Sequence, residues 1–333
     1  MTEHSKIPLP KGEGKSLFER AEGAFGGFEG FKPAPVPAEL AKPANRPVNK
    51  TAAPVAQEPT ALPPVPSAEP VRVAPVAPVA RPAHRTAFAS DPQKIDRARL
   101  QEQGLIVPGG PVSQLVEEFR IVKRQILLSA REAAVGDPSG AAQRVLVCSP
   151  LPAEGKTFCA TNLALSLAGE RDTEVLLVDA DFAKPSILSL LGLPGSKGLM
   201  DALADPAIRV EDCVIATDVP GLYVLPAGNR TASDNEYLTS HRTAEVLDRL
   251  TQGAPERMVI FDSPPALAAS PAAELAKHVG QALVICRADR TGQSALEDAL
   301  SLLSACPDIK LMLNAANFSP SGRKFGEYYG YGG

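Results

Sequence analysis

Residues 143–158 read QRVLVCSPLPAEGKTF, and this stretch decides the fold predicted for the rest of the chain. The aliphatic run VLV is typical of a buried strand, the SP pair ends that strand, and GKT begins a long helix. Backbone N–H groups at such a junction point at an anion, and the helix dipole favours the negative charge of a polyphosphate. The stretch therefore predicts a strand, a phosphate-binding loop and a helix.

Each residue type in this loop has a predicted task. Gly155 lets the backbone approach a phosphate closely, Lys156 reaches the β- and γ-phosphates, and the Thr157 hydroxyl ligates Mg²⁺. The residues expected to line the nucleotide are Pro152, Ala153, Glu154, Gly155, Lys156, Thr157 and Phe158. Pro150 stands where such loops usually begin with glycine. The alternative, an ordinary turn, would leave a lysine at a helix N-terminus, where the dipole disfavours it.

Downstream of Gly136, strands and helices alternate in the predicted structure. Strands are expected at residues 144–149, 174–179, 221–226, 257–262, 281–286 and 309–314. Helices are expected at residues 156–169, 185–192, 236–251, 271–278 and 292–305. This alternation predicts an α/β fold of the P-loop NTPase type, with a mostly parallel sheet flanked by helices on both faces. Ligands of such sheets bind beyond the carboxyl ends of the strands.

Acidic residues follow two of these strands. Asp179 and Asp181 come after VLLV, and Asp262 comes after MVIF. Two carboxylates at i and i+2 repel each other unless a cation lies near them, and Asp262 has the position of a Walker-B residue that holds Mg²⁺. A single Asp after a strand is usually a turn or a helix cap. Three of them beside a phosphate loop favour a metal–nucleotide site.

The N-terminal part of the chain has a different composition. Of the 33 prolines, 18 lie in the first 110 residues, in tracts such as PVRVAPVAPVARP. Such a segment cannot bury enough apolar surface to offset its chain entropy. We therefore predict a long disordered tether at residues 1–94, which is either a spacer or a docking segment. A second GKS string at residues 14–16 follows no apolar strand, so we interpret it as part of the tether.

Net charge, apolar runs and cysteine positions exclude several classes of protein. Residues 1–90 carry about +3 and the remainder about −7, which together make the −4 of the whole chain, so neither part predicts a nucleic-acid surface. There is no signal pattern and no apolar run of roughly 18 residues, so we expect a cytoplasmic protein without a membrane span. The five cysteines lie far apart in apolar runs and are predicted to be buried, reduced thiols.

A charged amphipathic helix is predicted within residues 95–136, beginning near Ser113 with SQLVEEFRIVKRQILLSAREAAVG. Its apolar face comprises Leu115, Phe119, Val122 and Ile126, at helical spacing. The opposite side holds Glu117, Arg120, Lys123 and Arg124. This charged side is either a solvent-exposed face or a contact with another subunit.

The last residues, 318–333, read FSPSGRKFGEYYGYGG. Tyr328, Tyr329 and Tyr331 are three of the chain's five tyrosines, and a glycine-rich terminus cannot bury their rings. One interpretation is an adhesive, disordered end. Beside a nucleotide site, the better one is a flexible phosphoacceptor that enters an active site.

Together these motifs resemble the bacterial tyrosine kinases, the P-loop family that phosphorylates its own C-terminal tyrosine cluster and controls polysaccharide synthesis. The loop PAEGKTF, the second motif LLVDAD, the third motif VIFDSPP and the tail YYGY occur in the family's order. The resemblance covers about residues 95–333. The segments IDRARLQEQGLIVPGGPVSQLVEEFRIVKR and ACPDIKLMLNAAN are similar to soluble tyrosine autokinases of exosortase-linked exopolysaccharide loci.

The resemblance implies an ATP- and Mg²⁺-dependent, non-specific protein-tyrosine autokinase, with its kinase domain at residues 137–317. The catalytic residues that it implies are Lys156, Asp179, Asp181 and Asp262. The metal ligands that it implies are Thr157, Asp179, Asp181 and Asp262. Asp179 and Asp181 would also activate the incoming tyrosine hydroxyl.

An assembly is implied as well. Glu117, Arg120 and Lys123 match the family's subunit contact, with a lysine in place of the last arginine. The acceptor tyrosines would come from a neighbouring subunit of a ring-like homo-oligomer. A membrane polysaccharide co-polymerase, acting in trans, would activate the chain and recruit it to the inner face of the plasma membrane.

Two other functions stay open. A partition or site-placement ATPase has a similar fold, but it carries a lysine where this chain has Leu151, and its membrane-placing members end in an amphipathic helix. A scaffold that binds ATP without transferring phosphate is the second, because Ala183 stands where the family usually has an arginine. Asn314, at the end of a predicted strand, is a candidate contact for adenine.

Overall fold

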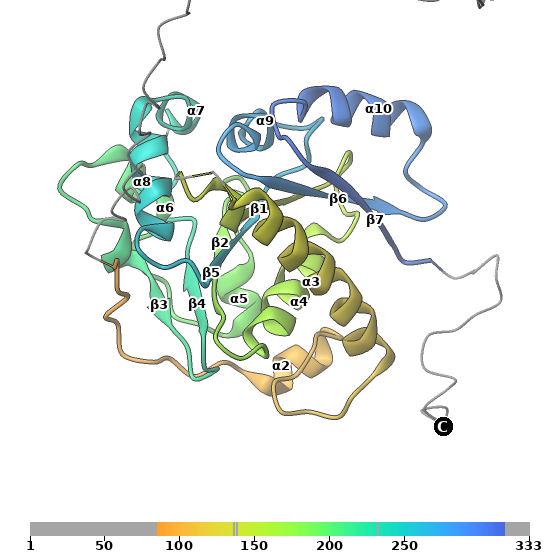
Figure 1. Cartoon of the computed structure of the whole chain (residues 1–333), viewed down its shortest axis with the longest axis horizontal. Coiled ribbons are helices and arrows are strands. Elements are labelled where there is room, and N and C mark those ends of the chain that lie inside the picture. Colours follow the sequence, from red (N-terminus) through yellow and green to blue (C-terminus); the bar gives the residue numbers. More distant parts are fainter. Residues whose placement is uncertain (1–84, 136, 138, 232, 317–333) are drawn as a thin grey trace, which may run out of the picture. The chain divides into compact units, whose positions relative to one another are not determined.

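The computed structural model describes residues 85–135, 137, 139–231 and 233–316 (Figure 1). Most of the predicted tether and the predicted acceptor tyrosines Tyr328, Tyr329 and Tyr331 lie outside these residues. Among the helices of the described part, none is long and apolar enough to cross a membrane.

A seven-stranded sheet forms the centre of the fold, in the order β3-β4-β2-β5-β1-β6-β7. The strands are β1 (Arg144–Cys148), β2 (Glu174–Asp179), β3 (Ile215–Ala216), β4 (Leu222–Leu225), β5 (Arg257–Asp262), β6 (Gln281–Arg287) and β7 (Ile309–Asn314). All neighbouring pairs are parallel except β3 and β4. The predicted α/β sheet is therefore confirmed. The sequence did not predict β3, because two residues are too few to display a period of two.

Helices cover the sheet from both sides (Figure 1). The α-helices are α2 (Arg97–Glu102), α3 (Gln114–Ala133), α4 (Lys156–Ala168), α5 (Ile187–Leu191), α6 (Leu199–Ala204), α7 (Asp234–Leu238), α8 (His241–Thr251), α9 (Pro271–Ala276) and α10 (Gln293–Leu302). Within the described ranges there are also two short 3₁₀ helices, η2 (Ala141–Gln143) and η3 (Val210–Cys213). The single helix predicted at residues 236–251 is wrong, because Ser240 is extended, with φ −76° and ψ 156°, and separates α7 from α8.

The core consists of two layers, one on each face of the sheet. In β1, Leu146 packs into the layer beneath α6, α8 and α9, whereas Val145 and Val147 pack into the layer beneath α3 and α4. Every residue of β1 and β5 is buried, as expected for central strands of a sheet that is covered on both faces. The five cysteines are buried free thiols, and burial raises the pKa of Cys148 and Cys159 to about 12.

Helix α3 corrects one sequence expectation. Lys123 was predicted on the charged outer side, but it is only 7% exposed. Its ammonium donates to the Ser166 carbonyl at 2.9 Å and pairs with Glu170 at 2.6 Å. These partners lie at the C-terminal end of α4, where free carbonyls and the helix dipole favour a cation. Lys123 therefore joins α3 to α4 instead of facing solvent.

The folded part begins before the predicted boundary at residue 94. The Phe88 ring packs edge-on against Tyr223, with ring centroids 5.1 Å apart, and the Arg257 guanidinium lies 4.0 Å from the centre of the Phe88 ring. Arg85 forms ion pairs with Glu174 and Glu256 at the start of β2 and β5. Residues 85–94 thus pack on the sheet instead of belonging to a tether.

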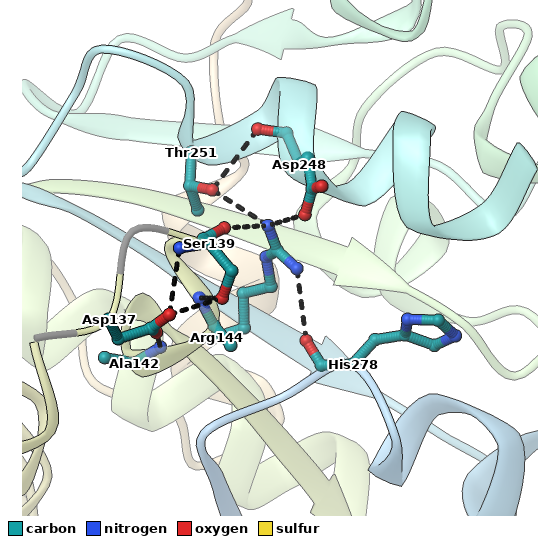
Figure 2. Close-up of polar contacts among 8 residues, drawn as sticks. Asp137, Ser139, Ala142, Arg144, Asp248, Thr251 and His278 are labelled. Atoms are coloured by element: carbon teal, nitrogen blue, oxygen red, sulfur yellow. Dashed lines mark hydrogen bonds and ion pairs between the residues drawn. The ribbon is translucent and has the colours of Figure 1, made fainter. Parts of the chain in front are cut away.

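A polar cluster anchors the opposite end of β1 from the phosphate loop (Figure 2). Arg144, which is 2% exposed, donates through Nη2 to the Asp248 carboxylate at 2.6 Å, the Ser139 carbonyl at 3.0 Å and the Thr251 hydroxyl at 3.1 Å. Its Nη1 donates to the His278 carbonyl at 3.2 Å. One guanidinium therefore ties the segment before β1 to α8 and to the segment after α9.

Candidate phosphate-loop site

The loop between β1 and α4 has the backbone of an anion-binding turn. Ala153 and Gly155 both have positive φ, 61° and 95°, and Ala153 is unusual in this because it carries a Cβ. Alternation of right- and left-handed residues makes consecutive N–H groups converge on one point, which binds anions. A Cβ added at Gly155 would come within 2.2 Å of the Asn314 Nδ2 atom. The site therefore requires glycine at this position.

The base of the loop is held by the segment that follows β5. The Ser263 N–H and hydroxyl both donate to the Val147 carbonyl at 3.1 Å, and the Ala266 N–H donates to the Ser149 carbonyl at 2.8 Å. The Ser149 hydroxyl closes the first turn on the Leu151 carbonyl at 2.7 Å. These hydrogen bonds thus hold the first part of the loop in one conformation.

Helix α4 presents its N-terminus to this loop. Its N-cap is Gly155, and no described side chain caps its first N–H groups, so these donors are available to a ligand. The Lys156 side chain is buried, and its Nζ lies 3.9 Å from the Asp181 carboxylate. The negative charge of Asp181 thus offsets the unfavourable interaction between the Lys156 ammonium and the positive end of the helix dipole.

Asp179 and Asp262 are register neighbours at the ends of β2 and β5, but their surroundings differ. The Asp179 carboxylate accepts from the Ser186 N–H at 2.8 Å, the Ile187 N–H at 3.0 Å and the Asp181 N–H at 3.3 Å. It therefore caps the start of α5. Burial raises the pKa of Asp179 to about 6, although these N–H groups oppose the shift.

Asp262 is fully buried, and neither of its carboxylate oxygens forms a hydrogen bond of normal geometry within the described part of the chain, although the Thr157 hydroxyl lies close enough to favour its charge. Burial raises its pKa to about 7, the Asp179 carboxylate adds to this, and the nearby Thr157 hydroxyl and Lys156 ammonium oppose it. An unpaired buried carboxylate is costly, and native structures retain one where a cation or ligand supplies the missing partner. Carboxylate and hydroxyl oxygens are the ligands that Mg²⁺ prefers.

The fold brings together the residues predicted at the carboxyl ends of three adjacent strands, β2, β5 and β1. Lys156 and Thr157 lie beside the carboxylates of Asp181 and Asp262. No group of three or more His, Cys, Asp or Glu residues in the described ranges is arranged to hold a metal ion by itself. Since Asp179 is engaged with backbone N–H groups, the geometry favours Asp262 and Thr157 as metal ligands, and the full predicted set stays a prediction.

The other residues predicted to line the nucleotide differ in exposure. Pro152 and Ala153 are exposed at the surface. Glu154 is fully buried, and its carboxylate accepts from the Leu151 N–H at 2.7 Å. Phe158 is partly buried and packs on the core layer beneath α3 and α4, so its side chain supports the helix.

Contacts from β6 and β7 to the loop were missed by the sequence analysis. Arg287 donates to the Ala153 carbonyl at 3.1 Å, and Asn314 donates to the Glu154 carbonyl at 2.8 Å. The Thr291 hydroxyl donates to the Glu154 carboxylate. Only the place of Asn314 at a strand end signalled a role for it. Arg287 and Thr291 carry no local motif, because tertiary folding alone brings them to a loop more than a hundred residues away.

Comparison with known proteins shows what this chain is similar to. No family model matches the chain. The tyrosine-protein kinase ptk of Acinetobacter johnsonii is 32% identical over 157 residues, which are 47% of this chain and 21% of that protein. The tyrosine-protein kinase YwqD of Bacillus subtilis is 28% identical over 237 residues, which are 71% of this chain and 93% of that protein. This chain thus covers about a fifth of the first relative and most of the second.

A solved structure shares the fold. The BceF tyrosine kinase domain superposes with a TM-score of 0.53 at 24% identity, over 67% of this chain and 91% of that domain. The predicted P-loop architecture is therefore confirmed at the level of the fold. The chain is accordingly a homologue of the bacterial tyrosine-protein kinases.

Proposed function

We propose that the chain is an ATP-dependent protein-tyrosine autokinase that transfers the γ-phosphate of Mg-ATP to tyrosines of its own C-terminal segment. The proposed acceptors are Tyr328, Tyr329 and Tyr331. The observation that carries the proposal is the buried Asp262 carboxylate, which has no partner in the described part of the chain and lies beside Lys156 and Thr157. A cation with a polyphosphate supplies what this carboxylate lacks.

The proposed roles follow from the contacts. Asp262 and the Thr157 hydroxyl hold Mg²⁺, which neutralises phosphate charge when bound. Lys156 exchanges its contact with Asp181 for the β- and γ-phosphates, since a phosphate oxygen forms a stronger contact than a carboxylate 3.9 Å away. The uncapped N–H groups of α4 and the loop bind the remaining phosphate oxygens.

The two acids after β2 take different parts in this proposal. Asp179 positions α5 and the turn that carries Asp181, because its oxygens already accept three backbone N–H groups. Asp181 loses the Lys156 ammonium to the nucleotide and then accepts the proton of the incoming tyrosine hydroxyl. A phenol has a pKa near 10 in model peptides, so a carboxylate that takes the proton during transfer lowers the barrier.

Assembly and partners belong to the same proposal. The acceptor tyrosines reach the site of a neighbouring copy, and Glu117 and Arg120, which pair with each other on α3, contribute to the contact between copies. Lys123 contributes indirectly, by fixing α3 to α4. The activator is a membrane polysaccharide co-polymerase, through which the cytoplasmic chain regulates exopolysaccharide synthesis. The names of the homologous kinases support the kinase activity in this proposal.

The test is tyrosine phosphorylation of the purified full chain by Mg-ATP, with and without the cytoplasmic segment of the co-polymerase. Lys156→Met should lower the rate by about two orders of magnitude, the size typical of losing one electrostatic contact to the transition state. Replacement of the three acceptor tyrosines by Phe should abolish labelling of the C-terminal segment. Lys277→Met, which removes a surface lysine paired with Glu274 on α9, is the control and should leave the rate unchanged.

Two results would contradict the proposal. ATP hydrolysis without phosphotyrosine under every condition would favour a switch ATPase of the partition type. ATP binding without hydrolysis or transfer would favour a scaffold.

A further inference from the structure

We propose that Asn314, Arg287 and Thr291 are positioning residues that aim the amide groups of the phosphate loop at the polyphosphate. The inference rests on the proposed nucleotide binding and adds a set of residues from outside the loop. None of the three comes from the loop itself, and all three lie on β6, β7 or the turn after β6.

Peptide geometry supplies the first step of the argument. In a trans peptide the C=O of one residue and the N–H of the next point in opposite directions. Arg287 holds the Ala153 carbonyl at 3.1 Å, and Asn314 holds the Glu154 carbonyl at 2.8 Å. Because both carbonyls are held toward β6 and β7, the N–H groups of Glu154 and Gly155 point the other way, into the loop.

The carboxylate of Glu154 supplies the second step. An acidic side chain inside a phosphate loop opposes a polyphosphate unless it is directed away. Glu154 is fully buried, one of its oxygens accepts from the Leu151 N–H at 2.7 Å, and the other accepts from the Thr291 hydroxyl. The same hydroxyl accepts from the Arg287 N–H at 2.8 Å, which fixes its direction. Thr291 thus holds the acid away from the phosphates, and the Glu154 carboxylate closes the loop by accepting from the Leu151 N–H.

Asn314 is itself held in place, so it can orient another group. Its Oδ1 accepts from the Ala315 N–H at 2.8 Å, and its carbonyl accepts from the Ala288 N–H at 2.9 Å. The Nδ2 atom lies 2.2 Å from the position that a Cβ of residue 155 would occupy. The absence of a side chain at Gly155 therefore leaves the space in which the Asn314 amide lies.

A contact to the adenine base is the competing role for Asn314, and the choice of ligand separates the two. Inorganic tripolyphosphate has the phosphates of ATP and lacks the base. If Asn314 orients the loop, Asn314→Ala and Asn314→Asp should weaken the binding of Mg-ATP and of magnesium tripolyphosphate by the same factor. We expect about three- to tenfold for Asn314→Ala, the value of one net hydrogen bond, and more for Asn314→Asp, which adds a negative charge. Isothermal titration calorimetry on the full chain measures both ligands.

Thr291 offers a matched pair of variants. Thr291→Val keeps the shape and removes the hydroxyl, so it should weaken both ligands about three- to tenfold. Thr291→Ser keeps the hydroxyl and should restore binding to within about twofold. Lys310→Ala, on β7 but paired with Asp308 at the opposite end of the strand, is the control for general damage to that strand. Thermal unfolding midpoints should agree among variants that are compared.

The binding results distinguish orientation of the loop from contact with the base. Loss of ATP binding with unchanged tripolyphosphate binding would assign Asn314 to the base and overturn the inference. Unchanged binding of both ligands, or no rescue by Thr291→Ser, would also overturn it. If Asn314→Ala does not fold, the Thr291 pair decides alone. If the wild-type chain binds neither ligand, the proposed function fails and this inference fails with it, whereas normal wild-type binding with unaffected variants removes only the inference.

Discussion

Two buried charged residues lie at opposite ends of the central strands, and they differ in the hydrogen bonds that their side chains form. Arg144, at the start of β1, is 2% exposed and donates four hydrogen bonds (Figure 2). Asp262, at the end of β5, is 0% exposed and receives none from the described part of the chain. Buried charges in native proteins are normally paired. The hydrogen-bonded Arg144 guanidinium, in which only Nε lacks a partner in the described part of the chain, is a structural anchor, whereas the Asp262 carboxylate, both of whose oxygens lack one, is our candidate for a ligand contact.

Burial disfavours the charged form of both side chains, as the direction of each pKa shift shows. Burial lowers the pKa of Arg144, but its hydrogen bond and ion pair with Asp248 oppose this shift. Burial raises the pKa of Asp262 to about 7, and the Asp179 carboxylate increases the shift. The ion pair with Asp248 thus offsets part of the cost of burying the Arg144 charge, whereas the Asp179 carboxylate adds to the cost of burying the Asp262 charge. Substitutions at the two positions should have opposite effects on stability.

The largest effect is expected for Arg144→Met. The variant fills a similar volume but leaves the Ser139 and His278 carbonyls without their donor, so the free energy of unfolding should fall by about 3 kcal/mol. Urea denaturation of the nucleotide-free chain measures the change. Affinity for Mg-ATP should stay within about twofold of wild type, because the cluster lies at the other end of β1. A loss of stability below about 0.5 kcal/mol would contradict the view that this cluster anchors the sheet.

Asp262→Asn should have the opposite sign. At pH 8 without Mg²⁺, an amide of the same shape replaces a buried unpaired charge, so the free energy of unfolding should rise by about 1–2 kcal/mol. Phosphotransfer should be lost, because the amide is a poor ligand for Mg²⁺. Lower stability together with normal activity would contradict the assignment of Asp262 as a metal-site residue.

The pH dependence supplies a control for this comparison. A carboxyl group with a folded-state pKa of about 7 and an unfolded-state pKa near 3.9 binds more protons in the folded state between these values. The contribution of Asp262 to the free energy of unfolding should therefore fall as the pH rises from about 4 to 7, and the difference between wild type and Asp262→Asn isolates it. Asp262→Asn lacks this term, so its advantage over wild type should shrink as the pH falls below about 7 and vanish below about 4, where Asp262 is protonated in both the folded and the unfolded state.

The smallest effect is expected for Asp248→Asn. Its side chain is 55% exposed, so solvent screens the ion pair with Arg144, and the amide oxygen still accepts the hydrogen bond. The free energy of unfolding should fall by about 0.5 kcal/mol. Thermal denaturation in low and high salt would measure it, and the difference from wild type should shrink at high salt. A loss as large as that of Arg144→Met would mean that the charge pair, and not the backbone contacts of Arg144, stabilises this end of the sheet.

Agreement between sequence and structure was highest where strands are buried on both faces. The bounds predicted for β2, β5 and β7 match the structure, because continuous apolar runs and the polar residues that end them are local signals. The short strand β3 and the helix α6 were missed, since each is too brief to display a period. Lys123 was misplaced because its partner, the Ser166 carbonyl, comes from another helix.

By itself, the sequence determined the α/β class, the phosphate loop after β1, and the approach of Asp179, Asp181 and Asp262 to one edge of the sheet. These follow from local periodicity and from the rule that parallel strands end at the same edge. Tertiary structure alone decided which acid is committed to the backbone and which is left without a partner. It also decided that Asn314 and Thr291 hold the loop. Hydrogen bonds between distant segments depend on how the chain folds in space, and no local pattern records them.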